Sequence, residues 1–319
     1  MMKACGIAVC VALAGLAIFP ALAWDVGPDQ PGTYAFGVYG TEFEDEARSR
    51  SMGLLVYYLL GKDDVPLESR PLVVFNHGFL LTSRDYRSCG QHVASHRFAV
   101  ALPSLPTSFL SVHHVRLAED VSSVIDCLID ATTNESHPLF GAIDPEWIGG
   151  SSHSLGGKLS LLKAGTEDRV KAIGVLDPVD EGNPIWNNPE RYPSVAPELM
   201  PDPLLLVGAE LESVVTTFSP CDPADENYRQ SYEDADLPAI EIAQLDVVHS
   251  QYVDEEAADE DSPCARGDVP SEWVRTSSAS YLTAFFLGHI GGCSEALDWL
   301  DARLLEEEDE GLILVRRKS

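Results

Sequence analysis

The stretch "IGGSSHSLGGKLSLL", residues 148–162, decides the fold and the chemistry to look for. Its first part is an apolar, strand-like run, and its second part has the spacing of a helix. A nucleophile on a sharp strand-to-helix turn needs small residues two positions before and after it, because those positions are crowded together. Only Ser154 meets this requirement, with Ser152 before it and Gly156 after it. We therefore interpret Ser151 and Ser152 as small residues of the turn and Ser154 as the nucleophile.

Strand-like and helical segments alternate on both sides of this stretch. Strand-like runs occur at 52–60, 71–79, 98–105, 171–179, 203–212 and 239–248, and helical patterns at 83–96, 117–132, 277–290 and 294–308. Such alternation predicts an α/β fold with a mostly parallel central sheet and helices on both faces. The chain shows no internal repeat and no long linker. We expect one domain over 24–319, with loop excursions at about 180–202 and 219–268.

Residues 1–23 have the pattern of a secretory signal peptide. One lysine precedes an apolar run, and Ala-Leu-Ala at 21–23 forms the exit before Trp24. The apolar run, 4–19, is short for a membrane span. We expect cleavage after residue 23, no stable membrane span in the mature protein, and a secreted or periplasmic location.

Export changes how the cysteines are interpreted. Two of the seven cysteines lie in the leader, and the five that remain are an odd number in an oxidising compartment. Cys221 and Cys264 bracket an acidic, loop-like stretch, and we favour them as a disulfide pair. No cysteines have the paired spacing of a structural zinc site, so we predict no metal.

The composition is strongly acidic, with 51 Asp and Glu against 21 Lys and Arg and a formal net charge of −30. This charge excludes nucleic acid as a partner, because the phosphates would be repelled. Two explanations stay open: a surface kept soluble by its charge, and adaptation to salt, where counter-ions screen the repulsion. The acidic runs within 219–268 lack the ligand spacing of a calcium loop, which favours a solvated face there.

A serine hydroxyl needs a base, and the base needs an acid that orients it. In hydrolases with this turn the chain order is serine, acid, histidine. His249 follows a strand and opens a loop, whereas His289 lies in an apolar helix, so we favour His249 as the base. Asp177 ends a strand and precedes proline, which places it at the edge where sites in open α/β sheets lie. Glu212, after the next strand, is the alternative acid.

Acyl transfer also needs N–H donors for the oxyanion. One expected donor is the backbone N–H of Leu155, directly after the nucleophile, and the second is that of Phe79 in "NHGF" at 76–79. His77 in the same motif is a candidate substrate contact, although a structural hydrogen-bonding role is commoner for a histidine at this place.

Three stretches together resemble plant-type chlorophyllases, which are α/β-hydrolases that cleave the phytyl ester of chlorophyll. They are "PLVVFNHGFLLTSRDYRSCGQHVASHRFAVALPSL" (71–105), "SHSLGGKLS" (152–160) and "AIGVLDPVD" (172–180), and "HSQYVDE" (249–255) is similar to a later element of that family. The resemblance covers roughly 70–290 and extends to platelet-activating-factor acetylhydrolase-like serine esterases. It implies the α/β-hydrolase fold, no cofactor, and a triad of Ser154, Asp177 and His249.

Two departures limit what the resemblance implies about the substrate. Ser152 and Leu155 replace a glycine and an arginine of the family's turn, and an export signal stands where a plastid transit peptide is usual. We predict an exported serine carboxylic-ester hydrolase for a small hydrophobic ester: a lipid, a pigment ester or a polyester. Trp186 and Tyr192 are candidate substrate contacts. The alternatives are a non-catalytic binding protein on this scaffold and a lipase or polyester hydrolase of the same fold. The oligomeric state stays open.

Overall fold

The computed structural model describes residues 26–61, 66–107, 113–164, 166–180, 203–211, 221–223, 226–235, 238–254 and 268–318. The predicted leader at 1–23 and the residues Trp186, Tyr192, Glu212 and Cys264 lie outside these ranges. Among the described helices, none combines the length and the apolar character that crossing a membrane requires.

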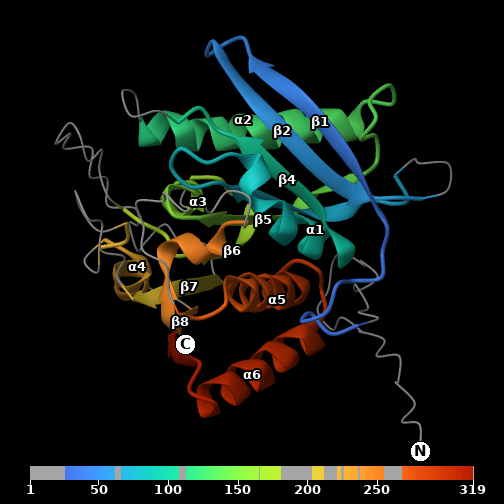
Figure 1. Ribbon diagram of the computed structural model, residues 1–319. Coiled ribbons are helices and arrows are strands. Elements are labelled where there is room, and N and C mark those ends of the chain that lie inside the picture. Colours follow the sequence, from blue (N-terminus) through green and yellow to red (C-terminus); the bar gives the residue numbers. More distant parts are fainter. Residues whose placement is uncertain are drawn as a thin grey trace, which may run out of the picture.

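One sheet runs through the described part of the chain, with the strand order β1-β2-β4-β3-β5-β6-β7-β8-β9 (Figure 1). The strands from β4 to β8 in this order are parallel to their neighbours, and β1, β2 and β9 join the two edges as antiparallel strands. The predicted mostly parallel sheet is therefore confirmed. The strands are β1 (Phe36–Asp45), β2 (Arg50–Leu59), β3 (Arg70–Asn76), β4 (Ala99–Ser104), β5 (Ile143–His153), β6 (Val170–Leu176), β7 (Leu204–Leu211), β8 (Ala239–Val248) and β9 (Ile313–Lys318).

Helices cover both faces of the sheet, as Figure 1 shows. One buried apolar cluster joins the sheet to α1 (Arg87–Ser95), α5 (Ser271–His289) and α6 (Ser294–Asp309). A second cluster joins its other face to α2 (His114–Thr133), α3 (Leu155–Ala164) and α4 (Tyr228–Asp234). The chain also forms two 3₁₀ turns, η2 (Ser83–Tyr86) before α1 and η4 (His249–Tyr252) after β8. This is the α/β-hydrolase fold that the sequence predicts.

The burial of a strand explains whether it could be predicted from the sequence. All of β3, "RPLVVFN", is buried, because a parallel strand covered on both faces is apolar throughout. The edge strands β1 and β9 are only partly buried and mix apolar with charged residues. The short apolar run of β9, Ile313-Leu314-Val315, is followed directly by three cations, and neither strand was predicted. The segment predicted as a helix over 83–96 begins with η2 before α1.

The cysteines divide into two kinds. Cys221 and Cys293 are disulfide-bonded, whereas Cys89 and Cys127 are free thiols. The pairing of Cys221 with Cys264 stays a prediction, because Cys264 lies outside the described residues.

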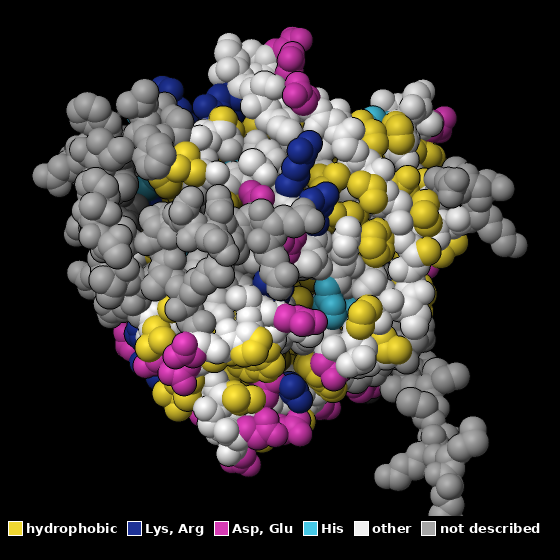
Figure 2. Space-filling view, in the orientation of Figure 1, with side chains coloured by type: hydrophobic (Ala, Val, Ile, Leu, Met, Phe, Trp, Pro, Cys, Tyr) yellow, Lys and Arg dark blue, Asp and Glu magenta, His cyan; other side chains and the backbone are white. Residues whose placement is uncertain are grey.

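The acidic side chains are spread over separate parts of the surface (Figure 2). Exposed carboxylates include Asp301, Glu306 and Asp309 of α6, and Glu42 and Glu44 of β1. These groups face solvent on an edge strand and on a helix, which fits the solvated-surface explanation of the charge.

Candidate active site

Ser154 occupies the turn between the end of β5 and the start of α3. Its φ is 56°, a left-handed conformation that is uncommon for residues other than glycine and is found where a turn imposes it. Ser154 is half-buried, whereas Ser151 and Ser152 are 1% and 0% exposed within the strand. Of these three serines, only Ser154 is not buried.

The two glycines after this turn let α3 begin close to the sheet. A Cβ at Gly156 would lie 2.2 Å from the carbonyl oxygen of Asn76, at the end of β3. A Cβ at Gly157 would lie 2.5 Å from the Cβ of Pro178, in the turn after β6. Both approaches are too close for a side chain, so the glycines set the position of the turn that carries the serine.

Asp177 and His249 meet although they are 72 residues apart. Asp177 directly follows β6, and His249 directly follows β8. The Nδ1 atom of His249 lies 2.7 Å from Oδ2 of Asp177, and both residues are buried. Asp177 Oδ1 also accepts a hydrogen bond of 3.3 Å from the backbone N–H of Ala209. The expected base and acid are thus hydrogen-bonded at the carboxyl edge of the sheet.

The surroundings of His249 stabilise its charged form. Burial lowers the pKa of His249, but the hydrogen bond that its ring donates to Asp177 and the negative charges of Asp177 and Asp222 outweigh burial and raise the pKa above 6.5. An imidazole held in this way is a stronger base and keeps one orientation, as general-base catalysis requires.

Backbone contacts tie Ser154 to this pair. The N–H of Ser154 donates to the carbonyl of Leu176 at 3.1 Å, and its own carbonyl accepts from the N–H of Val179 at 3.2 Å. These two partners flank Asp177 and Pro178 in the chain. On the other side, the ring of His153 lies 4.5 Å from the ring of His249. Ser154 is therefore next to segments that carry both other expected triad residues.

The loop after β3 lies against Ser154. A Cβ at Gly78 would be 3.2 Å from the Cβ of Ser154, so Phe79 follows a residue in direct contact with the expected nucleophile. Leu155 is the first residue of α3, and N–H groups in the first turn of a helix have no intrahelical acceptor. The two segments expected to supply oxyanion donors therefore both lie next to Ser154.

His77 supports this loop from inside. It is 1% exposed, its Nδ1 lies 2.7 Å from the carbonyl oxygen of Gly78, and its Nε2 accepts from the N–H of Leu105 at 2.7 Å. Because backbone groups use both ring nitrogens, the structure favours the structural role for His77 and gives the expected substrate contact no support.

The alternative base, His289, ends α5 and packs its ring 4.6 Å from that of Phe285. Burial lowers the pKa of His289 to about 4, and among the described residues no carboxylate compensates for it. This environment is that of a packed histidine, as the apolar helix suggested.

Three residues near the site were missed from sequence. Lys158 of α3 is fully buried and pairs its Nζ with Oδ1 of Asp180 at 2.6 Å. Both residues stand in stretches that carry the family resemblance, and their opposite charges were a usable signal. Asp222 is also fully buried, and Asp177, Asp222 and His249 have ligand atoms within 4.8 Å of one another. Nothing in the acidic loop singles out Asp222.

The set of Asp177, Asp222 and His249 offers donor atoms of a kind that zinc also takes. The hydrogen bond of 2.7 Å between His249 and Asp177 already uses Nδ1 of the ring. The geometry is that of an acid–base pair with a second carboxylate beside it.

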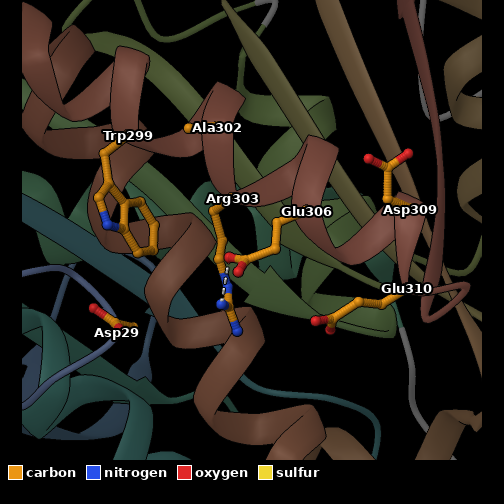
Figure 3. A pocket seen from close by; sticks show the side chains of 7 residues that line it. All are labelled: Asp29, Trp299, Ala302, Arg303, Glu306, Asp309 and Glu310. Atoms are coloured by element: carbon orange, nitrogen blue, oxygen red, sulfur yellow. Dashed lines mark hydrogen bonds and ion pairs between the residues drawn. The ribbon is translucent and has the colours of Figure 1, made fainter.

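A hollow of about 630 Å³ lies elsewhere, on the outer side of α6 (Figure 3). Its lining is Asp29, Trp299, Ala302, Arg303, Glu306, Asp309 and Glu310. The cation, Arg303, is paired with Glu306 at 3.1 Å and Glu307 at 2.7 Å. No expected triad residue lines this hollow, so it is separate from the site of ester chemistry.

Comparison with known proteins agrees with the geometry. The Chlorophyllase family matches residues 65–302, a span that contains Ser154, Asp177 and His249. Chlorophyllase-2 of Arabidopsis thaliana is 26% identical over 200 residues, which cover 58% of this chain and 61% of that protein. Chlorophyllase-1 of the same plant is 26% identical over 198 residues, 58% of this chain and 60% of that protein. The match thus spans about three-fifths of the length of these curated relatives. The family match covers well over half of the chain, and the chain belongs to the Chlorophyllase family.

Proposed function

We propose that this protein is a serine hydrolase of carboxylic esters, with Ser154, His249 and Asp177 as its triad. One observation carries the proposal. The buried hydrogen bond of 2.7 Å between His249 and Asp177 lies beside a serine held at φ 56° on a strand-to-helix turn. Serine, oriented histidine and buried acid are the three groups that acyl transfer needs.

In the proposed reaction, His249 takes the proton from Ser154 Oγ as this oxygen attacks the ester carbonyl carbon. The backbone N–H groups of Phe79 and Leu155 stabilise the oxyanion, and Asp177 stabilises the imidazolium. Collapse of the tetrahedral intermediate breaks the bond to the alcohol, which leaves with the proton from His249. Water, deprotonated by the same imidazole, then releases the acid from the acyl-enzyme.

The substrate class we propose is a hydrophobic ester. The segment after Gly78 reads Phe79-Leu80-Leu81. Leu80 is 43% exposed, and a Cβ at Gly78 would lie 3.3 Å from Leu81. Apolar side chains therefore stand next to the residue that contacts Ser154, where they can pack against an apolar acyl or alcohol group. The names of the curated relatives make chlorophyll one ester to test.

An ester panel tests this function. The purified protein is assayed on p-nitrophenyl esters of increasing acyl length and on chlorophyll a, beside Ser154→Ala and the matched control Ser152→Ala. We expect hydrolysis that increases with chain length, falls by about 10⁶-fold in Ser154→Ala, and persists in Ser152→Ala. Hydrolysis that survives in Ser154→Ala would contradict the proposal. Binding of these esters without turnover would favour the non-catalytic scaffold.

We also propose that the protein is exported and begins at Trp24 after cleavage. The support is the pattern of residues 1–23 alone. Intact mass and N-terminal sequencing of protein collected outside the cytoplasm test it. An N-terminus at Met1 on such protein would contradict cleavage.

A further inference from the structure

Asp222 reaches the site from a different strand than Asp177 does. It lies in the connection between β7 and α4, whereas Asp177 follows β6. Asp222 is 0% exposed, and its carboxylate lies within 4.8 Å of both the Asp177 carboxylate and a ring nitrogen of His249. The imidazole of His249 thus has carboxylates from two neighbouring connections close to it.

The backbone around Asp222 is held in place. Its carbonyl accepts a hydrogen bond of 3.2 Å from Nδ2 of Asn227, a fully buried residue that also caps α4. The carbonyl of Glu226 accepts from the N–H of Asp180 at 2.7 Å. The preceding residue, Cys221, is disulfide-bonded. The bond between Asp180 and Glu226 connects the segment of Asp222 to the turn that carries Asp177, and the other two contacts constrain the segment itself.

The negative charge of Asp222, a second buried carboxylate, affects the protonation of His249. Burying a carboxylate is unfavourable unless a cation or donors compensate, and two carboxylates this close repel each other. A proton on His249 relieves both costs. The ring of His153 packs on His249, and Tyr252 packs on His153. Burial keeps His153 neutral by lowering its pKa well below 6.5, and burial keeps Tyr252 neutral by raising its pKa well above 10. Among the described residues, the charges that face His249 are therefore those of Asp177 and Asp222.

We propose that Asp222 is a positioning residue for His249: a second carboxylate that, with Asp177, stabilises the imidazolium formed when Ser154 attacks the ester. The proposal rests on the proposed function, because it assigns a partner to the same base. The proton stays on His249, so Asp222 neither takes nor gives one.

The first test measures the protonation of His249 without any turnover. The ring of His249 is titrated by NMR in the Ser154→Ala protein and in the same protein with the further substitution Asp222→Asn. Asp222→Ser replaces Asp222→Asn if the asparagine variant fails to fold. Glu226→Gln, from the same segment, is the matched control. We expect the pKa of His249 to fall by about one unit when Asp222 is replaced and to stay unchanged in Glu226→Gln. An unchanged pKa in a folded Asp222 variant overturns the proposal.

The second test uses activity. In Asp222→Asn we expect kcat to fall about tenfold with little change in KM, and the acidic limb of the kcat/KM profile to move to lower pH. A purely structural Asp222 would lower the folded fraction without moving that limb. The two proposals fail separately. If wild-type Ser154 does not react with a fluorophosphonate, the proposed function fails. If Ser154 reacts but neither the limb nor the pKa moves in Asp222→Asn, this inference alone fails.

Discussion

The ring of His153 lies 4.5 Å from that of His249, and its Nε2 is 3.1 Å from the carbonyl oxygen of His249. The Nδ1 atom of His153 lies 2.7 Å from the hydroxyl of Tyr86, which accepts from the N–H of Gly78 at 3.2 Å. With Nδ1 accepting from Tyr86, Nε2 carries the hydrogen and donates to His249. One buried chain of hydrogen bonds thus joins the loop after β3, the serine turn and the expected base.

Replacing Tyr86 by phenylalanine tests this chain. The N–H of Gly78 and Nδ1 of His153 would lose a buried partner, so we expect unfolding free energy to fall by about 1–3 kcal/mol and kcat to fall more than KM rises. Denaturant unfolding and steady-state kinetics measure the two effects. Tyr57→Phe is the control, because Tyr57 is equally buried and, among the described residues, its hydroxyl only accepts a long hydrogen bond of 3.5 Å from Gln91. Equal losses of activity in both variants would contradict the link to His249.

The activity should depend on pH through His249. The imidazole must be neutral to take the proton of Ser154. Burial lowers the pKa of His249, but Asp177 more than compensates and raises this pKa above 6.5. We therefore expect kcat/KM to fall as the pH drops through a value above 6.5. Asp177→Asn should lower kcat by about 10⁴-fold and move this limb to lower pH. A limb below pH 6.5 in the wild type would argue against the Asp177–His249 pair.

His249 should also make the stability of the protein depend on pH, but in the opposite direction: its contribution is lost at high pH, whereas activity is lost at low pH. Because the folded-state pKa of His249 is raised, its contribution to the unfolding free energy is fully present below about pH 6.5 and is lost as the pH rises through the folded value. Unfolding measured across this window in Ser154→Ala, with and without Asp177→Asn, isolates the contribution. If Asp177→Asn leaves the slope between pH 6 and 8 unchanged, the pair does not stabilise the imidazolium.

The buried pair of Lys158 and Asp180 should support the turn after β6. Lys158 is fully buried, and its Nζ also donates to the Asp180 carbonyl at 3.0 Å. Lys158→Met should destabilise the protein by about 3 kcal/mol, at the low end for such pairs because Asp180 is partly exposed. Lys171→Met, at an exposed lysine, is the control for denaturant unfolding. Equal stability of the two variants would show that the pair contributes nothing.

Gly156→Ala should disrupt the serine turn itself. Its Cβ would lie 2.2 Å from backbone oxygen, which cannot move aside without shifting β3 or α3. We expect the free energy of unfolding to fall by about 1–3 kcal/mol and nearly all activity to be lost. Gly40→Ala in β1 is the control, since its nearest neighbour would be 3.9 Å away. Wild-type activity in Gly156→Ala would mean that the turn does not have this geometry.

The parts of the site predicted from sequence are those fixed by local chain geometry. Ser154 follows from the small residues around one turn, and Asp177 and His249 follow from strand ends that share one edge of a parallel sheet. Asp222 could not be predicted, because its closeness to His249 depends on the path of the whole connection from β7 to α4. For His77 the sequence named the structural role as the commoner one, but it could not name the partner, since Leu105 comes from the segment after β4. At the sheet edges, β1 and β9 were missed because edge strands that are only partly buried mix apolar with charged residues, and β9 has an apolar run of only three residues.

The most direct test of the account is to map the adduct that a fluorophosphonate probe forms on the folded protein. We predict one adduct, on Ser154, which mass spectrometry of the digested protein locates. It should be absent in Ser154→Ala, nearly absent in His249→Ala, and retained in Ser152→Ala. An adduct on another serine, or none on folded wild-type protein, would contradict the claim that Ser154 is an activated nucleophile.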